Sequence, residues 1–239
     1  MKYLLLFCGV LALLLEGALP AQAQRVLLQN EVAQDTVRPV SGPNRAYFGH
    51  LFLAYTAVLG RASAPGADLL FGRSGEFAIG MRNKFRLTQN LALGADVRYA
   101  RLTYHLAQND NKKVPATTQY RREHLGLQQL QGEAFVRFNA GRRGNSIGRY
   151  LDLIGWGGWA LRSTHYYEDQ PVAGSKKRQV TEHGLRYMQR WPYGCGARLG
   201  SGRLALVGHY RLSSTFVGAA KEQYPELPRW TLGLELGWF

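Results

Sequence analysis

The chain has 239 residues, and its 30 Lys+Arg against 16 Asp+Glu give a formal net charge of +14. An apolar fraction of 46% with 12% aromatic residues excludes a disordered chain, and two cysteines exclude a disulfide scaffold or a cysteine-based zinc cluster. The charge is compatible with nucleic-acid binding, but the N-terminal segment argues against that partner.

Residues 1–23 have the order of a secretory signal peptide. Lys2 supplies the positive region, an almost unbroken apolar run covers 3–15, and Ala-Gln-Ala at 21–23 is a small-x-small cleavage site. The apolar run is too short to span a bilayer comfortably, and no later segment reaches 18 consecutive apolar residues. We therefore expect an exported chain without a nucleic-acid partner, with 24–44 as a periplasmic N-terminal extension and 45–239 as one barrel domain.

Most segments after residue 44 alternate apolar and polar residues with a period of two, which is typical of strands. In 76–87, for example, Phe77 and Ile79 fall on one face, while Arg82 and Lys84 fall on the other. The pattern predicts eight strands, at 47–59, 76–87, 91–106, 125–139, 150–164, 185–199, 204–216 and 230–239. Pro192 lacks a ladder donor, so we expect a bulge or an edge position there.

The connections between these strands alternate in length. Those at 88–90, 140–149 and 200–202 are short, whereas those at 60–75, 107–124, 165–184 and 217–229 are long and polar. An up-and-down barrel with short turns at one end and long loops at the other has this order. An immunoglobulin-type sandwich with Greek-key crossings is not expected to produce it. The predicted fold class is all-β, an eight-stranded antiparallel up-and-down transmembrane β-barrel.

One face of each strand is apolar, and the other carries charges at mid-strand. A membrane barrel turns the apolar face to lipid and the charged face to its lumen, whereas a soluble barrel does the reverse. The export signal, the Trp and Tyr residues near strand ends and a chain that ends within a strand favour the membrane barrel. The predicted lumen charges are Arg82, Lys84, Asp96, Arg98, Glu133, Arg137, Arg190, Arg211 and Glu235.

The last strand, Arg-Trp-Thr-Leu-Gly-Leu-Glu-Leu-Gly-Trp-Phe at 229–239, resembles the C-terminal strand of gram-negative outer-membrane β-barrels. By pattern, 45–239 resembles the small eight-stranded barrels of the OmpA-transmembrane type. The resemblance implies an outer-membrane location and a terminal signal, here Trp238 and Phe239, that the barrel-assembly machinery reads. It implies an architecture and no particular activity.

Two roles are open for the lumen, and two for the loops. An eight-stranded barrel is just wide enough for side chains to fill, so Arg–carboxylate pairs are expected to plug it. A narrow anion-selective path is the alternative. The loop clusters are either solvated or in contact with lipopolysaccharide phosphates. They comprise Lys112, Lys113, Arg121, Arg122, Lys176, Lys177 and Arg178.

The hypothesis that the protein is an enzyme depends on the residues around His209. Lipid A deacylases, which are outer-membrane barrels, carry a His-x-Ser-Asn element, and His209, Ser213 and Glu222 are the nearest counterparts here. Four residues along a strand separate His209 from Ser213 by roughly 13 Å, too far for a hydrogen bond. We therefore expect a monomeric structural or surface-interaction protein without cofactor or metal. The alternatives are a deacylase-like enzyme, an anion-selective pore and a soluble secreted β-barrel binder.

Overall fold

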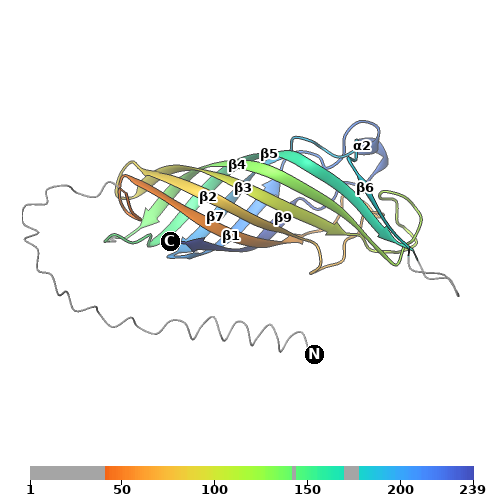
Figure 1. Cartoon of the computed structure of the whole chain (residues 1–239), viewed down its shortest axis with the longest axis horizontal. Coiled ribbons are helices and arrows are strands. Elements are labelled where there is room, and N and C mark those ends of the chain that lie inside the picture. Colours follow the sequence, from red (N-terminus) through yellow and green to blue (C-terminus); the bar gives the residue numbers. More distant parts are fainter. Residues whose placement is uncertain (1–40, 142–143, 170–177) are drawn as a thin grey trace, which may run out of the picture. The chain divides into compact units, whose positions relative to one another are not determined.

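The computed structural model describes residues 41–141, 144–169 and 178–239, so the predicted signal peptide and most of the N-terminal extension lie outside the described residues. Nine strands and one short helix are present in this part of the chain (Figure 1). In chain order they are β1 (Tyr47–Leu59), β2 (Gly75–Arg86), β3 (Leu91–His105), β4 (Arg122–Ala140), β5 (Arg149–Glu168), β6 (Gln179–His183), β7 (Tyr193–Ser201), β8 (Leu204–Arg211), α2 (Ala220–Gln223) and β9 (Trp230–Trp238).

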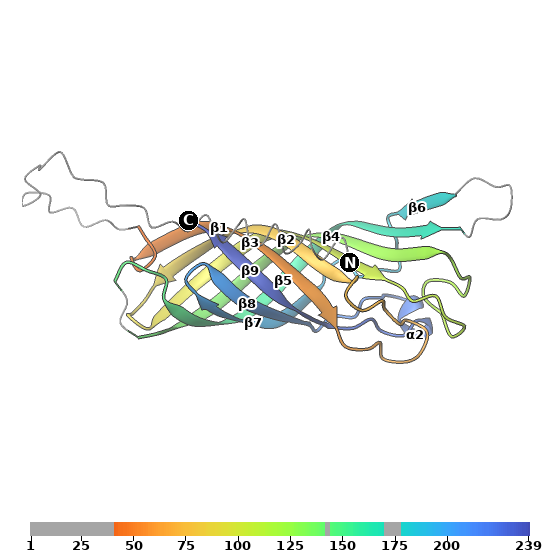
Figure 2. The same ribbon diagram turned by 90° about the horizontal axis from the view of Figure 1, so that it is seen from below.

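Eight of the strands close into an antiparallel barrel. The hydrogen-bonded order is β4-β3-β2-β1-β9-β8-β7-β5, and β4 also pairs with β5, which completes the circle. The seam between the first and last strands runs from Leu51 opposite Trp238 to Leu59 opposite Trp230. The predicted all-β, eight-stranded antiparallel barrel is confirmed. We call the end with the short connections the turn end and the opposite end the loop end (Figure 2).

The strand boundaries differ from the predicted ones in the second half of the chain. β7 begins at Tyr193 rather than residue 185, because Pro192 has no N–H to donate to the ladder. β8 ends at Arg211 rather than residue 216, and Phe216, at the end of the predicted strand, is fully buried inside the loop end. The predicted loop 165–184 contains an extension of β5 and the added strand β6, which pairs with β5 alone.

Alternation of the side chains places charge inside the barrel and apolar groups outside. On β2, Arg82 is 1% exposed, whereas Phe77 and Met81 are 47% and 48% exposed. Other outward apolar residues are Leu51, Tyr55, Ile79, Phe85, Leu93, Val97, Leu130, Phe138, Leu153, Leu199, Leu206, Leu232, Leu234 and Leu236. A closed ladder satisfies the backbone polar groups without water, and an apolar exterior over a polar interior is the arrangement of a membrane barrel.

Exposed aromatic side chains border this apolar band. Trp159 and Trp191 stack with ring centroids 5.9 Å apart, and Trp230 packs on Tyr210 at 4.8 Å. Beyond Tyr99 the outward positions of β3 become polar, with Arg101 exposed and Thr103 and His105 half-buried. The loop-end parts of β3 and β4 therefore project past the apolar band.

Inside, three layers follow one another along the barrel. Phe48, Ile147, Tyr150 and Ala205 form an apolar cluster near the turn end. Charged side chains occupy the middle. The loop end is filled by a larger apolar cluster, the loop-end plug, made of Val58, Ala67, Leu102, Tyr104, Leu106, Val114, Leu125, Leu127, Met188, Phe216, Ala220 and Leu227. Loop residues thus pack down between the strand ends.

The turn end is also covered by chain segments. The amide of Asn44 donates from Nδ2 to the carbonyl of Gly144 at 2.9 Å, and Arg86 donates to the carbonyl of Asn44 at 2.8 Å. Phe239 packs edge-on against Phe48, with ring centroids 5.4 Å apart, whereas Trp238 is 74% exposed. The two residues predicted as an assembly signal therefore point in opposite directions, Phe239 toward the barrel mouth and Trp238 outward.

Candidate functional site

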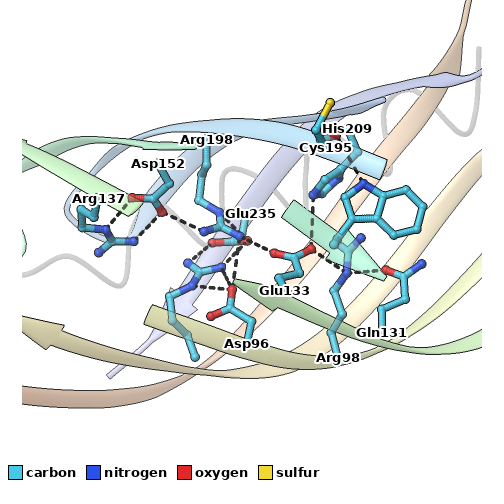
Figure 3. A network of polar contacts seen from close by, with 12 residues as sticks. Asp96, Arg98, Gln131, Glu133, Arg137, Asp152, Cys195, Arg198, His209 and Glu235 are labelled. Atoms are coloured by element: carbon cyan, nitrogen blue, oxygen red, sulfur yellow. Dashed lines mark hydrogen bonds and ion pairs between the residues drawn. The ribbon is translucent and has the colours of Figure 1, made fainter. Parts of the chain in front are cut away.

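The middle layer of the lumen is the densest set of charged groups in the described residues. Its members come from inward positions of β2, β3, β4, β5, β7 and β9, so it assembles only when the barrel closes (Figure 3). Four of the arginines and five carboxylates interact there, each almost fully buried, namely Arg82, Arg98, Arg137, Arg198, Glu76, Asp96, Glu133, Asp152 and Glu235. We call these nine residues the lumen network.

Arg198 on β7 lies at the centre of the lumen network. Its Nη1 is 2.8 Å from Asp152, and its Nη2 is 3.0 Å from Glu133 and 3.3 Å from Asp96. Its Nε lies 3.2 Å from Glu235. One guanidinium therefore joins carboxylates from β5, β4, β3 and β9, which suits the planar, multiply donating geometry of arginine.

Two further arginines form bidentate pairs on either side of Arg198. Arg82 places Nη1 and Nη2 at 2.5 and 2.9 Å from the two oxygens of Glu235, and its Nε donates to Asp96 at 2.8 Å. Arg137 binds both oxygens of Asp152, at 2.7 and 2.8 Å. Such fork-to-fork pairs are the strongest charge-assisted hydrogen bonds that a carboxylate accepts.

The loop-end edge of the lumen network is formed around Arg98. Its Nε lies 3.0 Å from Glu133 and donates to the Gln131 side chain at 2.6 Å, and its Nη2 is 3.3 Å from Glu76. His209 Nε2 lies 3.2 Å from Glu133. Our list of predicted lumen charges omitted Arg198, the centre of the lumen network, together with Glu76 and Asp152, although the inward parity of their strands marks all three.

Three residues that we predicted in the lumen are not part of the lumen network. Lys84 is buried near the turn end, where its ammonium group donates to the carbonyl of Pro43. Arg211 pairs with Glu226 of the following loop at 3.0 Å. Arg190 is exposed, with its guanidinium over the ring of Trp159 at 5.9 Å, so its assignment to the lumen was wrong. The error follows from the late start of β7, which places residue 190 outside the alternating ladder.

The three residues nearest to a deacylase motif have separate partners. His209 lies against Glu133, as described above. The hydroxyl of Ser213 accepts a hydrogen bond from the backbone N–H of Tyr193 at 3.2 Å. Glu222 is an exposed residue of α2. The geometry therefore places His209 beside a carboxylate inside the lumen, whereas Ser213 bonds to the backbone of Tyr193.

A second charged cluster lies at the loop end, around Glu123. Lys112 Nζ is 2.5 Å from Glu123, His165 Nε2 is 2.8 Å from it, and His165 Nδ1 is 3.2 Å from Glu182. Lys112 is only 4% exposed, so its predicted contact with lipopolysaccharide was wrong. Within the described residues, no group of three or more His, Cys, Asp or Glu side chains is arranged to hold a metal ion.

The other basic residues predicted to contact lipopolysaccharide are scattered over the loop end. Lys113 and Arg122 are exposed, and Arg121 pairs with Glu168 at 3.2 Å. Arg178 lies 3.8 Å from Asp169. Lys176 and Lys177 fall outside the described residues. Two of the described basic residues are therefore partly neutralised by a neighbouring carboxylate.

His105 and His124 face each other on the outside of the projecting part of β3 and β4, with ring centroids 5.1 Å apart. Burial, followed by the charge of His105, lowers the pKa of His124 from 6.5 to about 4. Between these two pH values the unfolded chain binds a proton at His124 and the folded protein does not. Stability therefore falls as the pH drops from about 6.5 toward 4.

We expect the loss of stability from His124 to reach about 1 kcal/mol at pH 4.5, after allowance for solvent screening of this half-exposed group. Urea unfolding in detergent at pH 7.5 and 4.5 measures it, and His124→Gln should reduce the difference between the two pH values. If His124→Gln and the unsubstituted protein lose the same stability on acidification, other groups carry the pH dependence.

No family model matches the chain, and no curated protein matches it. One similar solved structure is that of Ail, the attachment invasion locus protein of Yersinia pestis, in complex with the heparin analogue sucrose octasulfate. The alignment covers 80% of this chain and 97% of that one, at 9% identity and a TM-score of 0.34. Among the described residues, no helix is long and apolar enough to cross a membrane. The fold assignment rests on the strand pairing itself.

Proposed function

We propose that the protein is an outer-membrane β-barrel with a closed lumen and a structural or surface-interaction role. The proposal is supported by the distribution of polarity across the barrel wall. Leu234 and Val97 are 62% and 57% exposed at outward positions, whereas Arg198 and Asp152 are 1% and 0% exposed inside. A soluble secreted barrel reverses this order, because water then wets the outer face.

The lumen network is the single observation that best supports a closed lumen. Each of its four arginines lies within 3.3 Å of at least one carboxylate, so no row of unneutralised cations lines the interior there. An anion-selective path needs such a row. The loop-end plug covers the same lumen with apolar side chains. The balance of charge inside means that most of the net charge of +14 belongs to the rest of the chain.

The remaining parts of the proposal concern the route to the membrane and the partners there. Residues 1–23 act as a cleaved export signal, and the barrel-assembly machinery reads the strand that ends in Trp238 and Phe239. The short turns and both termini then face the periplasm, and the loop end faces outward. Lipid and lipopolysaccharide are the proposed partners of a monomer, and no enzymatic activity is assigned to it.

The membrane location and the closed lumen are tested together on the protein expressed from the whole sequence and recovered from the membranes of the expressing cells. We expect extraction from membranes by detergent alone and a faster-migrating band on a gel when the sample is not heated, because a closed barrel resists dodecyl sulfate. In planar bilayers we expect no reproducible conductance steps, with a porin preparation in the same chamber as the positive control. Solubility in buffer would refute the membrane location, and anion-selective steps would refute the closed lumen.

A further inference from the structure

A pocket of about 430 Å³ lies between β5 and the segment that leads into β7. The two segments are hydrogen-bonded above and below it. The N–H of Gly184 donates to Ser163 at 2.9 Å, and the N–H of Ala160 donates to Arg190 at 2.9 Å. The missing ladder between these bonds leaves room for the pocket, whose lining residues include Arg162, Arg186 and Arg190.

These three arginines differ from those of the lumen network because none has a carboxylate partner among the described residues. Arg162 donates to His183 Nε2 at 3.0 Å, and the guanidinium of Arg190 lies over the Trp159 ring. All three are exposed. Three cations without counter-charges around one pocket provide a site for a dianionic group such as a phosphate.

An apolar groove continues from this pocket down the outer wall of the barrel. It has a volume of about 520 Å³, and its walls include Leu130, Trp159, Trp191 and Tyr193. Its floor includes Gly132, which pairs with Gly157, and a Cβ atom at either glycine would meet nothing within 4 Å. The groove exists because two glycines lie side by side between bulky outward side chains.

The groove and the pocket are consecutive along the same pair of segments. Trp159 and Trp191 line the groove, and the next outward residues toward the loop end, Leu161 and Arg190, line the pocket. A second groove of about 510 Å³ extends the path toward the turn end past Ala134 and Gly155, which also pair. A basic pocket above an aromatic border and an apolar channel has the polarity of a lipid molecule, headgroup to tail.

We propose that this site binds a phosphorylated lipid of the lipid A type from the outward leaflet. Its phosphate contacts Arg162, Arg186 and Arg190, and one acyl chain lies in the groove over Gly132 and Gly157. The inference rests on the proposed membrane location and makes it specific. It also moves the expected lipopolysaccharide contact from the loop tips, where Lys112 is buried, to the outer wall at the membrane border.

The headgroup is tested by native mass spectrometry of the full chain in detergent with bis-phosphorylated lipid A, dephosphorylated lipid A or phosphatidylcholine. We expect the unsubstituted protein to retain the bis-phosphorylated lipid, and the triple variant Arg162→Gln, Arg186→Gln, Arg190→Gln to retain about tenfold less, because each lost guanidinium removes a charge-assisted contact. Dephosphorylated lipid A should be retained as poorly by the unsubstituted protein.

A control variant removes the same charge elsewhere at the loop end, with Lys113→Gln, Arg121→Gln and Arg122→Gln, and should retain the lipid normally. The acyl groove is tested by Gly157→Leu, which fills open space in the groove, against Ala57→Leu, which adds the same side chain at an outward position on β1. Gly157→Leu should lower lipid retention severalfold, and Ala57→Leu should leave it unchanged.

Equal retention by the two triple variants would overturn the site, as would a preference for phosphatidylglycerol over lipid A in a competition between them. Unchanged retention by Gly157→Leu would refute the acyl groove. The unheated gel band of each sample separates these outcomes from failure of the proposed membrane location. A heat-modifiable barrel that retains no lipid refutes this inference alone, whereas a chain soluble in buffer refutes the membrane location itself.

Discussion

Replacement of Arg198 by methionine is expected to lower the free energy of unfolding by about 3–5 kcal/mol. Arg198 lies within 3.3 Å of four carboxylates, from Asp96, Glu133, Asp152 and Glu235. Methionine has a similar volume but no charge, so the substitution leaves these carboxylates buried with one cation fewer. Buried charges without a partner are far more costly than the intact pair is stabilising.

The measurement is urea-induced unfolding of the refolded protein in detergent micelles, followed by the unheated gel band and by tryptophan fluorescence. Arg61→Met is the matched control, because Arg61 is exposed on a loop and its replacement should change stability by less than about 0.5 kcal/mol. Arg198→Lys keeps the positive charge but not the planar guanidinium, so its loss of stability should lie between those of Arg198→Met and Arg61→Met. A loss below about 1 kcal/mol for Arg198→Met would show that water or a neighbouring arginine replaces it.

Replacement of Gly233 by alanine is expected to prevent stable closure of the barrel, with a loss of about 3 kcal/mol or more. Gly233 lies on β9 opposite Thr56 of β1, at the seam that joins the last strand to the first. A Cβ atom there would overlap the carbonyl oxygen of Tyr55 and lie 2.5 Å from the Cα of Thr56. Both obstacles are backbone atoms, so the clash is relieved only if the two strands move apart.

The matched control for this prediction is Gly155→Ala. Gly155 is also a strand glycine paired with a neighbour, here Ala134 of β4, but a Cβ atom at residue 155 would meet nothing within 4 Å. We expect Gly155→Ala to keep the heat-modifiable band and Gly233→Ala to lose most of it. If both variants fold equally well, the seam tolerates a wider spacing than the structure has.

The two predictions concern the same physical event, because the lumen network depends on the seam. Glu235 is on β9, two residues from Gly233, and binds Arg82 of β2 and Arg198 of β7. Arg82 does not have this carboxylate until β9 pairs with β1, because β2 joins β9 only through β1, whereas β7 joins β9 through β8. Variants that weaken the seam should therefore also separate Arg82 from Glu235. The double variant Gly233→Ala, Arg198→Met should lose less than the sum of its parts, because both substitutions act on the contacts of Glu235.

Residue patterns alone were enough to predict the all-β class, the eight barrel strands and the order of short and long connections. Those features are local, because alternation with a period of two and the position of turn residues depend on neighbours in the chain. On β2, the alternation of Phe77 and Ile79 with Arg82 and Lys84 matches the exposed and buried positions of the strand. The inward parity of Arg98 and Glu133 follows from the same signal.

Which charged side chains form pairs could not be predicted from residue patterns, because it depends on how the strands are arranged in space. Arg82, Arg198 and Glu235 are far apart in the chain, and strand stagger and barrel closure set their distances. Arg190 was misplaced because Pro192 delays the start of β7. Lys112 was misplaced because its loop folds inward onto Glu123. Neither effect produces a periodic pattern in the sequence. The basic pocket on the outer wall could not be predicted either. It depends on a break in the backbone ladder between β5 and residues 184–190. Such a break depends on how two segments pair, so neither segment shows it in its own sequence.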